Sequence, residues 1–361
     1  MRGRISEFLK KHRSSLVLFF VVILVVVGVA WFQVGGRLPT PKDVANVAKE
    51  TAGNASKVAS SLLGNEFNIN EEKFIVDPSK LVGGGPPKDG IPSIDEPKFE
   101  SAVKAEEWMR GNDRVFGIVH KGEARAYPQR ILVWHEIVNE KIKGDPILIT
   151  YCPLCQSSLA FERKVELSDG SKVETEFGIS GKLYNSNLVM YNRTNDKVKT
   201  ESLWTQFGGK AIIGDFTGQE LEKVILDTVT WKNWKAKHPD TKVLSRDTGF
   251  ARDYDNDPYG SYYTQEGVIA PLENTDDRLF EKALVFGIKI GDKTKAYPED
   301  ELKKTPKFTD TFAGKKIEIT RNSDGSVRMK NLTDNKAIVP EIGFWFAWAA
   351  FNPDTELYRA P

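Results

Sequence analysis

After about residue 80, apolar and polar residues alternate over short stretches, which is the pattern of half-buried β-strands. Residues 114–120 and 123–127 predict a β-hairpin, and a second hairpin is expected to end in the apolar strand 146–151. Pro128 suits the start of a short helix, because the first helical turn does not need its missing N–H. The pattern therefore predicts a β-rich α+β fold.

The same hydrophobic pattern occurs twice. Residues 115–150 and 285–320 share 12 identities in 36 positions without a gap. A second motif, Trp-x-x-Trp followed by Pro-Asp-Thr, begins at Trp231 and again at Trp345. Such internal repetition indicates a duplicated structural unit. We expect two related β lobes, with both indoles of each Trp-x-x-Trp motif on one face of a short helix and buried in the core.

The repeats suggest the organisation of the whole chain. Copy one covers about 114–244 and contains an insertion after residue 151, whereas copy two covers about 284–358. Both lie within a domain predicted for residues 81–361, and residues 37–80 are expected to be a linker or stalk because they are rich in Ala, Lys and Ser.

The N-terminal region contains a long apolar segment. Ser14–Gly36 is a run of 23 residues without charge, and Leu16–Phe32 is almost wholly Val, Leu, Ile and Phe. Such a run predicts one transmembrane helix. The basic residues before it predict a cytoplasmic tail, so residues 1–36 form tail and anchor, and a single-pass protein of the cell membrane would carry its C-terminal domain outside the cytoplasm. A cleaved signal peptide is the alternative, although its apolar core is usually shorter.

Composition narrows the classes of function. With 51 Lys and Arg against 50 Asp and Glu, the net charge of +1 provides no general field for nucleic acid. Two cysteines cannot build a framework of several disulfides, so the fold must depend on its hydrophobic core.

The two cysteines form the most specific chemical signal. They stand as Cys152-Pro-Leu-Cys155 directly after the strand 146–151, and the matching strand of copy two runs instead into Arg321-Asn-Ser-Asp-Gly325. Outside the cytoplasm, two thiols this close are expected to oxidise together or to hold a metal. A structural disulfide is the simpler reading, but so small a ring constrains the unfolded chain little.

Two chemistries fit the pair. As a redox dithiol, Cys152 and Cys155 would be catalytic, one attacking as thiolate and the other resolving the mixed disulfide. As a metal site, they would need further ligands, for which His135 is the first candidate and Met190 the next. This soft set favours copper, and zinc is the less favoured choice. Each histidine or methionine could equally be an ordinary core or surface residue.

A different class of function is a binding module for a peptide or glycan, in which the cysteine pair would be only a structural disulfide. This hypothesis predicts an exposed row of aromatic side chains, namely Trp204, Tyr254, Tyr259, Tyr262 and Tyr263. The sequence does not decide whether the protein is an enzyme, and it names no substrate or protein partner.

Several longer motifs resemble the family catalogued as domain of unknown function 3179. The matching segments are Gly84–Pro92, Ala124–Pro128, Trp134–Asn139, Thr150–Cys155, Ser180–Tyr191, Thr200–Trp204 and the two Trp-x-x-Trp segments. The similarity covers roughly residues 80–358. It implies a secreted or membrane-anchored domain in which the Cys-Pro-Leu-Cys loop and the His135-Glu136 pair are signature positions, and it implies no established activity.

Overall fold

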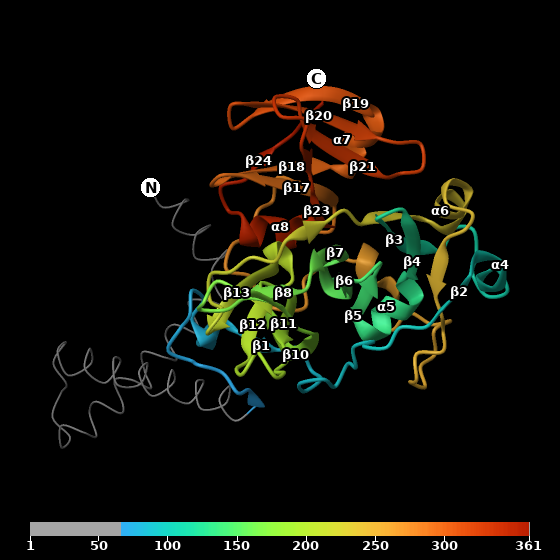
Figure 1. The fold of residues 1–361 in the computed structure, drawn as a ribbon. Coiled ribbons are helices and arrows are strands. Elements are labelled where there is room, and N and C mark those ends of the chain that lie inside the picture. Colours follow the sequence, from blue (N-terminus) through green and yellow to red (C-terminus); the bar gives the residue numbers. More distant parts are fainter. Residues whose placement is uncertain (1–65, 361) are drawn as a thin grey trace, which may run out of the picture. The chain divides into compact units, whose positions relative to one another are not determined.

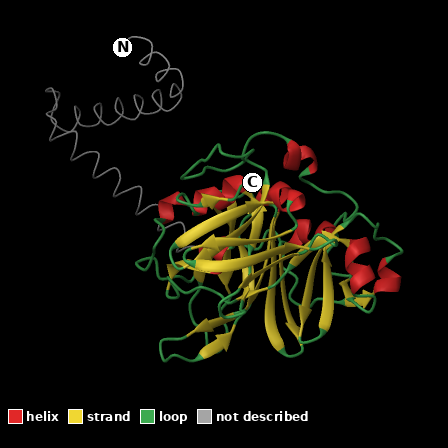
Figure 2. Ribbon diagram, turned by 90° about the horizontal axis from the view of Figure 1, so that it is seen from above, coloured by secondary structure: helices red, strands yellow, loops and turns green. Residues whose placement is uncertain are grey.

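The computed structural model describes residues 66–360, and most of the regular structure in this range is β-strand. The short helices lie around the margins of the strands (Figure 2). The helices and 3₁₀ turns are η1 (Pro78–Lys80), α4 (Ala102–Ala105), α5 (Gln129–His135), η2 (Pro153–Cys155), η3 (Phe207–Gly209), α6 (Trp231–Lys237), η4 (Gly260–Thr264), α7 (Glu299–Lys304) and α8 (Trp345–Phe351).

Copy one begins with a five-stranded sheet. Its strands, in spatial order, are β15 (Asp227–Thr230), β3 (Arg114–His120), β4 (Glu123–Pro128), β16 (Lys242–Leu244) and β2 (Phe99–Ser101). The second hairpin of copy one belongs to a different, eight-stranded sheet. That sheet contains β24 (Glu356–Leu357), β18 (Lys293–Pro298), β17 (Leu284–Ile290), β23 (Glu341–Phe344), β7 (Ser157–Glu162), β6 (Asp145–Cys152) and β5 (Ile137–Ile142), with β14 (Lys223–Val224) paired to β7.

The strand pairing follows the sequence repeat. In copy one β3 lies between β15 and β4, with β16 parallel to β4; in copy two β17 lies between β23 and β18, with β24 parallel to β18. Each copy continues with a second antiparallel hairpin. In copy one it is β5–β6, and in copy two it is β19 (Lys307–Phe312) with β20 (Lys315–Arg321). The latter joins a four-stranded sheet with β21 (Val327–Asn331) and β22 (Ala337–Ile338).

A glycine and a tryptophan make the same contact in each copy. A Cβ atom on Gly117 would lie 2.3 Å from the ring of Trp234, and one on Gly287 would lie 2.2 Å from the ring of Trp348. Each of these indoles also donates a hydrogen bond of 2.9 Å to a threonine hydroxyl, Thr241 or Thr355. The repeated motifs therefore encode one packing unit, in which a ring occupies the space left by the missing side chain.

The two related lobes expected from the repeat share one sheet. The eight-stranded sheet contains strands of both copies, because β23 of copy two pairs with β17 on one side and with β7 of copy one on the other. Figure 1 shows β23 between the orange strands of copy two and the green strands β5–β7. The pairing of β23 with β7 joins residues nearly two hundred positions apart, so local pattern could not predict it.

The prediction of a transmembrane helix must also be corrected, because no such helix is part of the fold that the structure describes. Among residues 66–360, no helix is long and apolar enough to cross a membrane. The segment 14–36, for which that helix was predicted, lies outside the described residues. The predicted location at the cell membrane stays untested.

Strands of the copy-one insertion form another sheet, which one short strand from before copy one completes. Its strands, in spatial order, are β1 (Val82–Gly83), β10 (Phe177–Tyr184), β11 (Asn187–Asn192), β12 (Ser202–Thr205) and β13 (Lys210–Gly214), and a separate hairpin consists of β8 (Lys164–Glu166) and β9 (Lys172–Glu174). Within the predicted linker 37–80, residues 66–80 pack on this sheet: Phe67 is buried, and Ile69 and Phe74 bridge to Glu201 and Ile213.

Candidate functional site

The cysteine loop connects two neighbouring strands of the eight-stranded sheet. β6 ends at Cys152, which pairs with Ser157 at the start of β7, and the residues between them form the 3₁₀ turn η2. Pro153 suits the first position of that turn, because its φ is fixed and its missing N–H is not required there. The turn brings Cys152 and Cys155 to within 3.0 Å of each other. Both are free thiols and both are buried.

Buried polar groups from the insertion converge on the sulfur of Cys155. The Phe207 N–H donates to Oδ1 of Asn187 (3.0 Å), which fixes the orientation of that amide. Nδ2 of Asn187 therefore faces the other way, and donates to Cys155 Sγ (3.0 Å) and to Gln206 Oε1 (2.8 Å). The Ser157 hydroxyl also donates to Gln206 Oε1. An amide donor is thus held on the sulfur by a network whose members are fully buried.

The two thiols differ in acidity. Burial raises the pKa of Cys152 well above its ordinary value, and the hydrogen bond and charge of Cys155 raise it further. Burial acts in the same direction on Cys155, but hydrogen bonds from Cys152, Asn187 and the backbone N–H of Ser157 favour the thiolate and hold the pKa of Cys155 below its ordinary value. Cys155 is therefore the more nucleophilic sulfur at neutral pH, because the thiolate is the reactive form.

A buried carboxyl group lies beside this pair. Glu136 follows α5, with a positive φ of 56° that is unusual for a residue with a side chain. Its backbone is held by hydrogen bonds of 2.7 Å to Leu132 and to Tyr151 on β6. Burial, and then the charge of Cys152, raise the pKa of Glu136 well above its ordinary value. The neutral acid adds no negative charge next to the thiolate.

Both ring nitrogens of His135 bind groups other than the cysteines. Its Nδ1 lies 2.8 Å from the carbonyl oxygen of Pro92, and its Nε2 lies 2.7 Å from the hydroxyl of Tyr254. Burial lowers the pKa of His135, so the ring is neutral, with Nδ1–H donating to Pro92 and Nε2 accepting from Tyr254. Both nitrogens are occupied, and a metal would have to displace Tyr254 from Nε2.

Met190 is fully buried on β11 and belongs to the same hydrophobic cluster as Cys152 and Cys155. In residues 66–360, no group of three or more His, Cys, Asp or Glu side chains could hold a metal ion. The residues present therefore do not fit the predicted set of two thiolates and an imidazole. The copper or zinc site with Cys152, Cys155, His135 and Met190 stays a prediction without a described ligand sphere.

The aromatic residues of the binding-module hypothesis do not form an exposed row. Trp204 and Tyr254 are buried, and Tyr259, Tyr262 and Tyr263 are partly buried. These last three pack against the hydrophobic cluster that contains both cysteines. The Tyr262 hydroxyl donates to the carbonyl of Leu154, between the cysteines (2.8 Å). Of the five aromatic residues, Tyr262 therefore contacts the cysteine loop directly.

The supporting residues Asn187, Gln206 and Ser157 were not singled out from the sequence. Asn187 lies in the segment Ser180–Tyr191, whose polar residues interrupt an otherwise apolar strand pair. Asn185 and Ser186, just before it, both adopt positive φ in a buried hairpin turn, a conformation that glycine usually occupies. Buried Asn and Ser at such a turn were the available signal.

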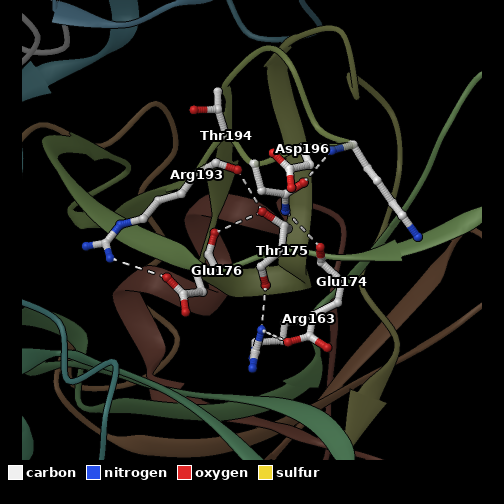
Figure 3. A pocket seen from close by; sticks show the side chains of 9 residues that line it. Arg163, Glu174, Thr175, Glu176, Arg193, Thr194 and Asp196 are labelled. Atoms are coloured by element: carbon white, nitrogen blue, oxygen red, sulfur yellow. Dashed lines mark hydrogen bonds and ion pairs between the residues drawn. The ribbon is translucent and has the colours of Figure 1, made fainter.

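The pocket drawn in Figure 3 lies elsewhere, on the insertion. It has a volume of about 460 Å³ and contains neither cysteine. Its two arginines are already engaged: Arg163 donates to Thr175 and pairs with Glu174, and Arg193 pairs with Asp95 outside the lining. With these cations neutralised, the pocket shows no arrangement of groups for a particular reaction.

Comparison with known proteins places the cysteine loop inside a described family. Residues 88–342 match the model described as Protein of unknown function (DUF3179). No curated protein and no solved structure matches the chain significantly. The matched range covers well over half of the chain and includes the cysteine loop, Asn187 and Gln206. The chain therefore belongs to the DUF3179 family.

Proposed function

We propose that the protein is a dithiol–disulfide redox protein whose centre is the pair Cys152 and Cys155. The observation that carries the proposal is the hydrogen bond from the oriented amide of Asn187 to Cys155 Sγ, in a pair of adjacent free thiols. An amide donor at a buried sulfur stabilises the thiolate, which is the form that attacks a disulfide. The second thiol is near enough to resolve the product.

The proposed reaction transfers two electrons from the pair to a small disulfide, RSSR. The Cys155 thiolate attacks one sulfur, the S–S bond of RSSR breaks, and RS⁻ leaves. The Cys152 thiol then loses its proton and its sulfur attacks Cys155, so that a second RS⁻ leaves and the internal disulfide forms. Both leaving thiolates take up protons according to their own pKa values. The protein is oxidised, and RSSR is reduced to two thiols.

The copper hypothesis is the alternative for the same residues. Because His135 has no free nitrogen, it would depend on the sulfur atoms of Cys152, Cys155 and Met190. Soft sulfur ligands suit copper(I), but no nitrogen ligand from residues 66–360 supports the set. We therefore treat copper binding as an outcome of the experiment.

The test is a redox titration of the full chain in glutathione buffers, followed by acid quenching, maleimide labelling and intact-mass analysis. The proposal predicts a transition from two labelled thiols to none, with a midpoint in the range of known redox dithiols, about −270 to −120 mV. Cys152→Ser and Cys155→Ser should show no such transition. A pair that keeps both thiols throughout, or stays oxidised below about −300 mV, would contradict the redox role.

Metal analysis of the same samples separates the alternative. Stoichiometric copper that persists in the redox buffers, and is lost in Cys152→Ser, Cys155→Ser and Met190→Leu, would replace the redox proposal with a copper site. Copper content that is equal in the wild type and these variants would remove the copper hypothesis.

A further inference from the structure

Both sulfurs are inaccessible in the described conformation, so the proposed chemistry needs a way in. Cys152 is 1% exposed and Cys155 is fully buried. Part of the cover is the segment 259–267, which contains η4 and which we call the lid. Its tyrosines 259, 262 and 263 pack against the cluster that holds the cysteines. Burial raises the pKa values of Tyr259 and Tyr262, and the nearby Cys152 raises both further, consistent with this proximity.

The lid makes few polar contacts with the cysteine loop. The Tyr262 hydroxyl donates to the Leu154 carbonyl (2.8 Å), and Tyr263 bonds to Asp257 (2.9 Å) outside the loop. Within residues 66–360 the lid pairs with no strand, and its backbone hydrogen bonds are those of η4 and the flanking turns. A segment held in this way can open locally at a lower free energy than global unfolding requires.

Two adjacent side chains, those of Glu281 and Lys282, bind the lid. Lys282 Nζ donates to the carbonyls of Tyr262 (2.8 Å) and Gln265, and it lies 3.9 Å from the centre of the Tyr262 ring. The neighbouring Glu281 carboxylate accepts the backbone N–H of Gly267. Lys282 and Glu281 thus form hydrogen bonds with both halves of the lid.

Lys282 is an unusual residue to find in this position. It is 5% exposed, and it forms no ion pair with any residue in the range 66–360. Burial lowers the pKa of Lys282. Burying an ammonium group without an ion pair is costly, and the two carbonyls, the tyrosine ring and the nearby charge of Glu281 offset part of that cost. These contacts are lost when the lid opens. The interactions that offset the burial of Lys282 are therefore present only while the lid is closed.

The backbone that carries Glu281 and Lys282 is held by hydrogen bonds to α8. The carbonyls of Glu281 and Ala283 accept hydrogen bonds of 2.8 Å from the backbone N–H groups of Phe346 and Trp345, at the first turn of α8. Those N–H groups have no partner within the helix, so the bonds satisfy both elements. Through Trp345 and Trp348, α8 is buried in the same hydrophobic cluster as the two cysteines. The fixed side of the latch is therefore the core, and the movable side is the lid.

We propose that residues 259–267 form a lid, latched by Lys282 and Glu281, which controls access of small thiols and disulfides to Cys155. This inference concerns the regulation of the proposed redox site, and it rests on that proposed function. The cysteine pair lies in copy one, whereas the latch residues directly precede copy two and are anchored on its helix α8. Opening of the lid, without global unfolding, would expose the sulfurs.

The test measures alkylation of Cys155 by iodoacetamide in the reduced full chain, under native conditions and over a series of low urea concentrations. Lid opening predicts a wild-type rate that barely depends on urea, because little surface is exposed. Lys282→Met should raise that rate at least ten-fold and keep the weak urea dependence. Tyr262→Phe, which removes one hydrogen bond, should raise it about five-fold.

Lys295→Met is the matched control. Lys295 is also buried, on β18 of copy two, but it pairs with Asp310 away from the lid. It should leave the alkylation rate unchanged at equal global stability. A Lys282→Met rate that rises with urea as steeply as global unfolding, or that equals the wild-type rate, would overturn the latch.

The result is independent of the redox titration. If the pair does not form a disulfide in glutathione buffers while Lys282→Met still opens access, the redox function fails and the lid stands. If the pair titrates but the variants alkylate at the wild-type rate, only the lid fails. Should Lys282→Met not fold, Tyr262→Phe together with Lys295→Met gives the same comparison, and an unchanged Tyr262→Phe rate would overturn the proposal.

Discussion

Replacing Asn187 with alanine tests the electrostatic basis of the site. The change removes the Nδ2 donor that lies 3.0 Å from Cys155 Sγ. A hydrogen bond to a charged group contributes about 1.5–3 kcal/mol, and one pKa unit corresponds to about 1.4 kcal/mol. Losing this donor should therefore raise the pKa of Cys155 by about 1–2. The thiolate fraction below that pKa should fall by about 10- to 100-fold.

The assay is the pH dependence of alkylation of the reduced protein, with each rate divided by its plateau at high pH. This ratio reports the pKa of the thiol and cancels any change in access. Asn192→Ala is the control, because Asn192 is a fully buried asparagine at the other end of β11 whose amide accepts from Ser202 and Trp204. A curve for Asn187→Ala that coincides with that of the wild type or of the control would refute the reasoning.

Three further predictions follow from the fold. Gly287→Ala should lower the free energy of unfolding by about 3 kcal/mol because its Cβ would overlap the Trp348 ring, whereas Gly83→Ala, with open space at its Cβ, should change it by less than about 0.5 kcal/mol in urea unfolding. Burial raises the pKa of Glu140 from 4.5 to about 7, so the native state holds its proton longer than the unfolded state, and stability should fall as pH rises from about 4.5 to about 7; Glu140→Gln should flatten that part of the stability–pH curve, and an unchanged slope would contradict the assignment. His135→Gln should leave metal content and the redox midpoint of the full chain unchanged in the assays above, since both ring nitrogens serve the fold; loss of either property would restore His135 to the site.

The duplication and the packing of its tryptophans were accessible from the sequence because they are local. Identical residues at a fixed offset encode the same strand order in each copy, and the Gly117–Trp234 and Gly287–Trp348 contacts explain why glycine and tryptophan recur together. The assembly of the copies was not accessible. The pairing of Ile342 with Ser158 joins the two copies in one sheet, and the local sequence around either residue does not predict this pairing.

The candidate site shows the same division. The nearness of Cys152 and Cys155 follows from three residues of spacing, but the environment of their sulfurs comes from distant segments. His135 immediately precedes Glu136, which lies beside the cysteines, yet Tyr254 and Pro92 occupy its nitrogens. Asn187, the group that does bind the sulfur, comes from the insertion. Residue type and spacing suggested a soft-ligand site, whereas tertiary hydrogen bonding determines which groups are free to act.

The most direct test of the central claim is trapping of the proposed intermediate. The reduced full chain of Cys152→Ser, which lacks the resolving thiol, is incubated with a small disulfide and its intact mass is measured over time. The redox account predicts that Cys152→Ser accumulates a mixed disulfide at Cys155, and that Cys155→Ser, which keeps only the less acidic thiol, reacts at least ten-fold more slowly. Equal rates in the two variants, or no adduct in Cys152→Ser, would contradict the account.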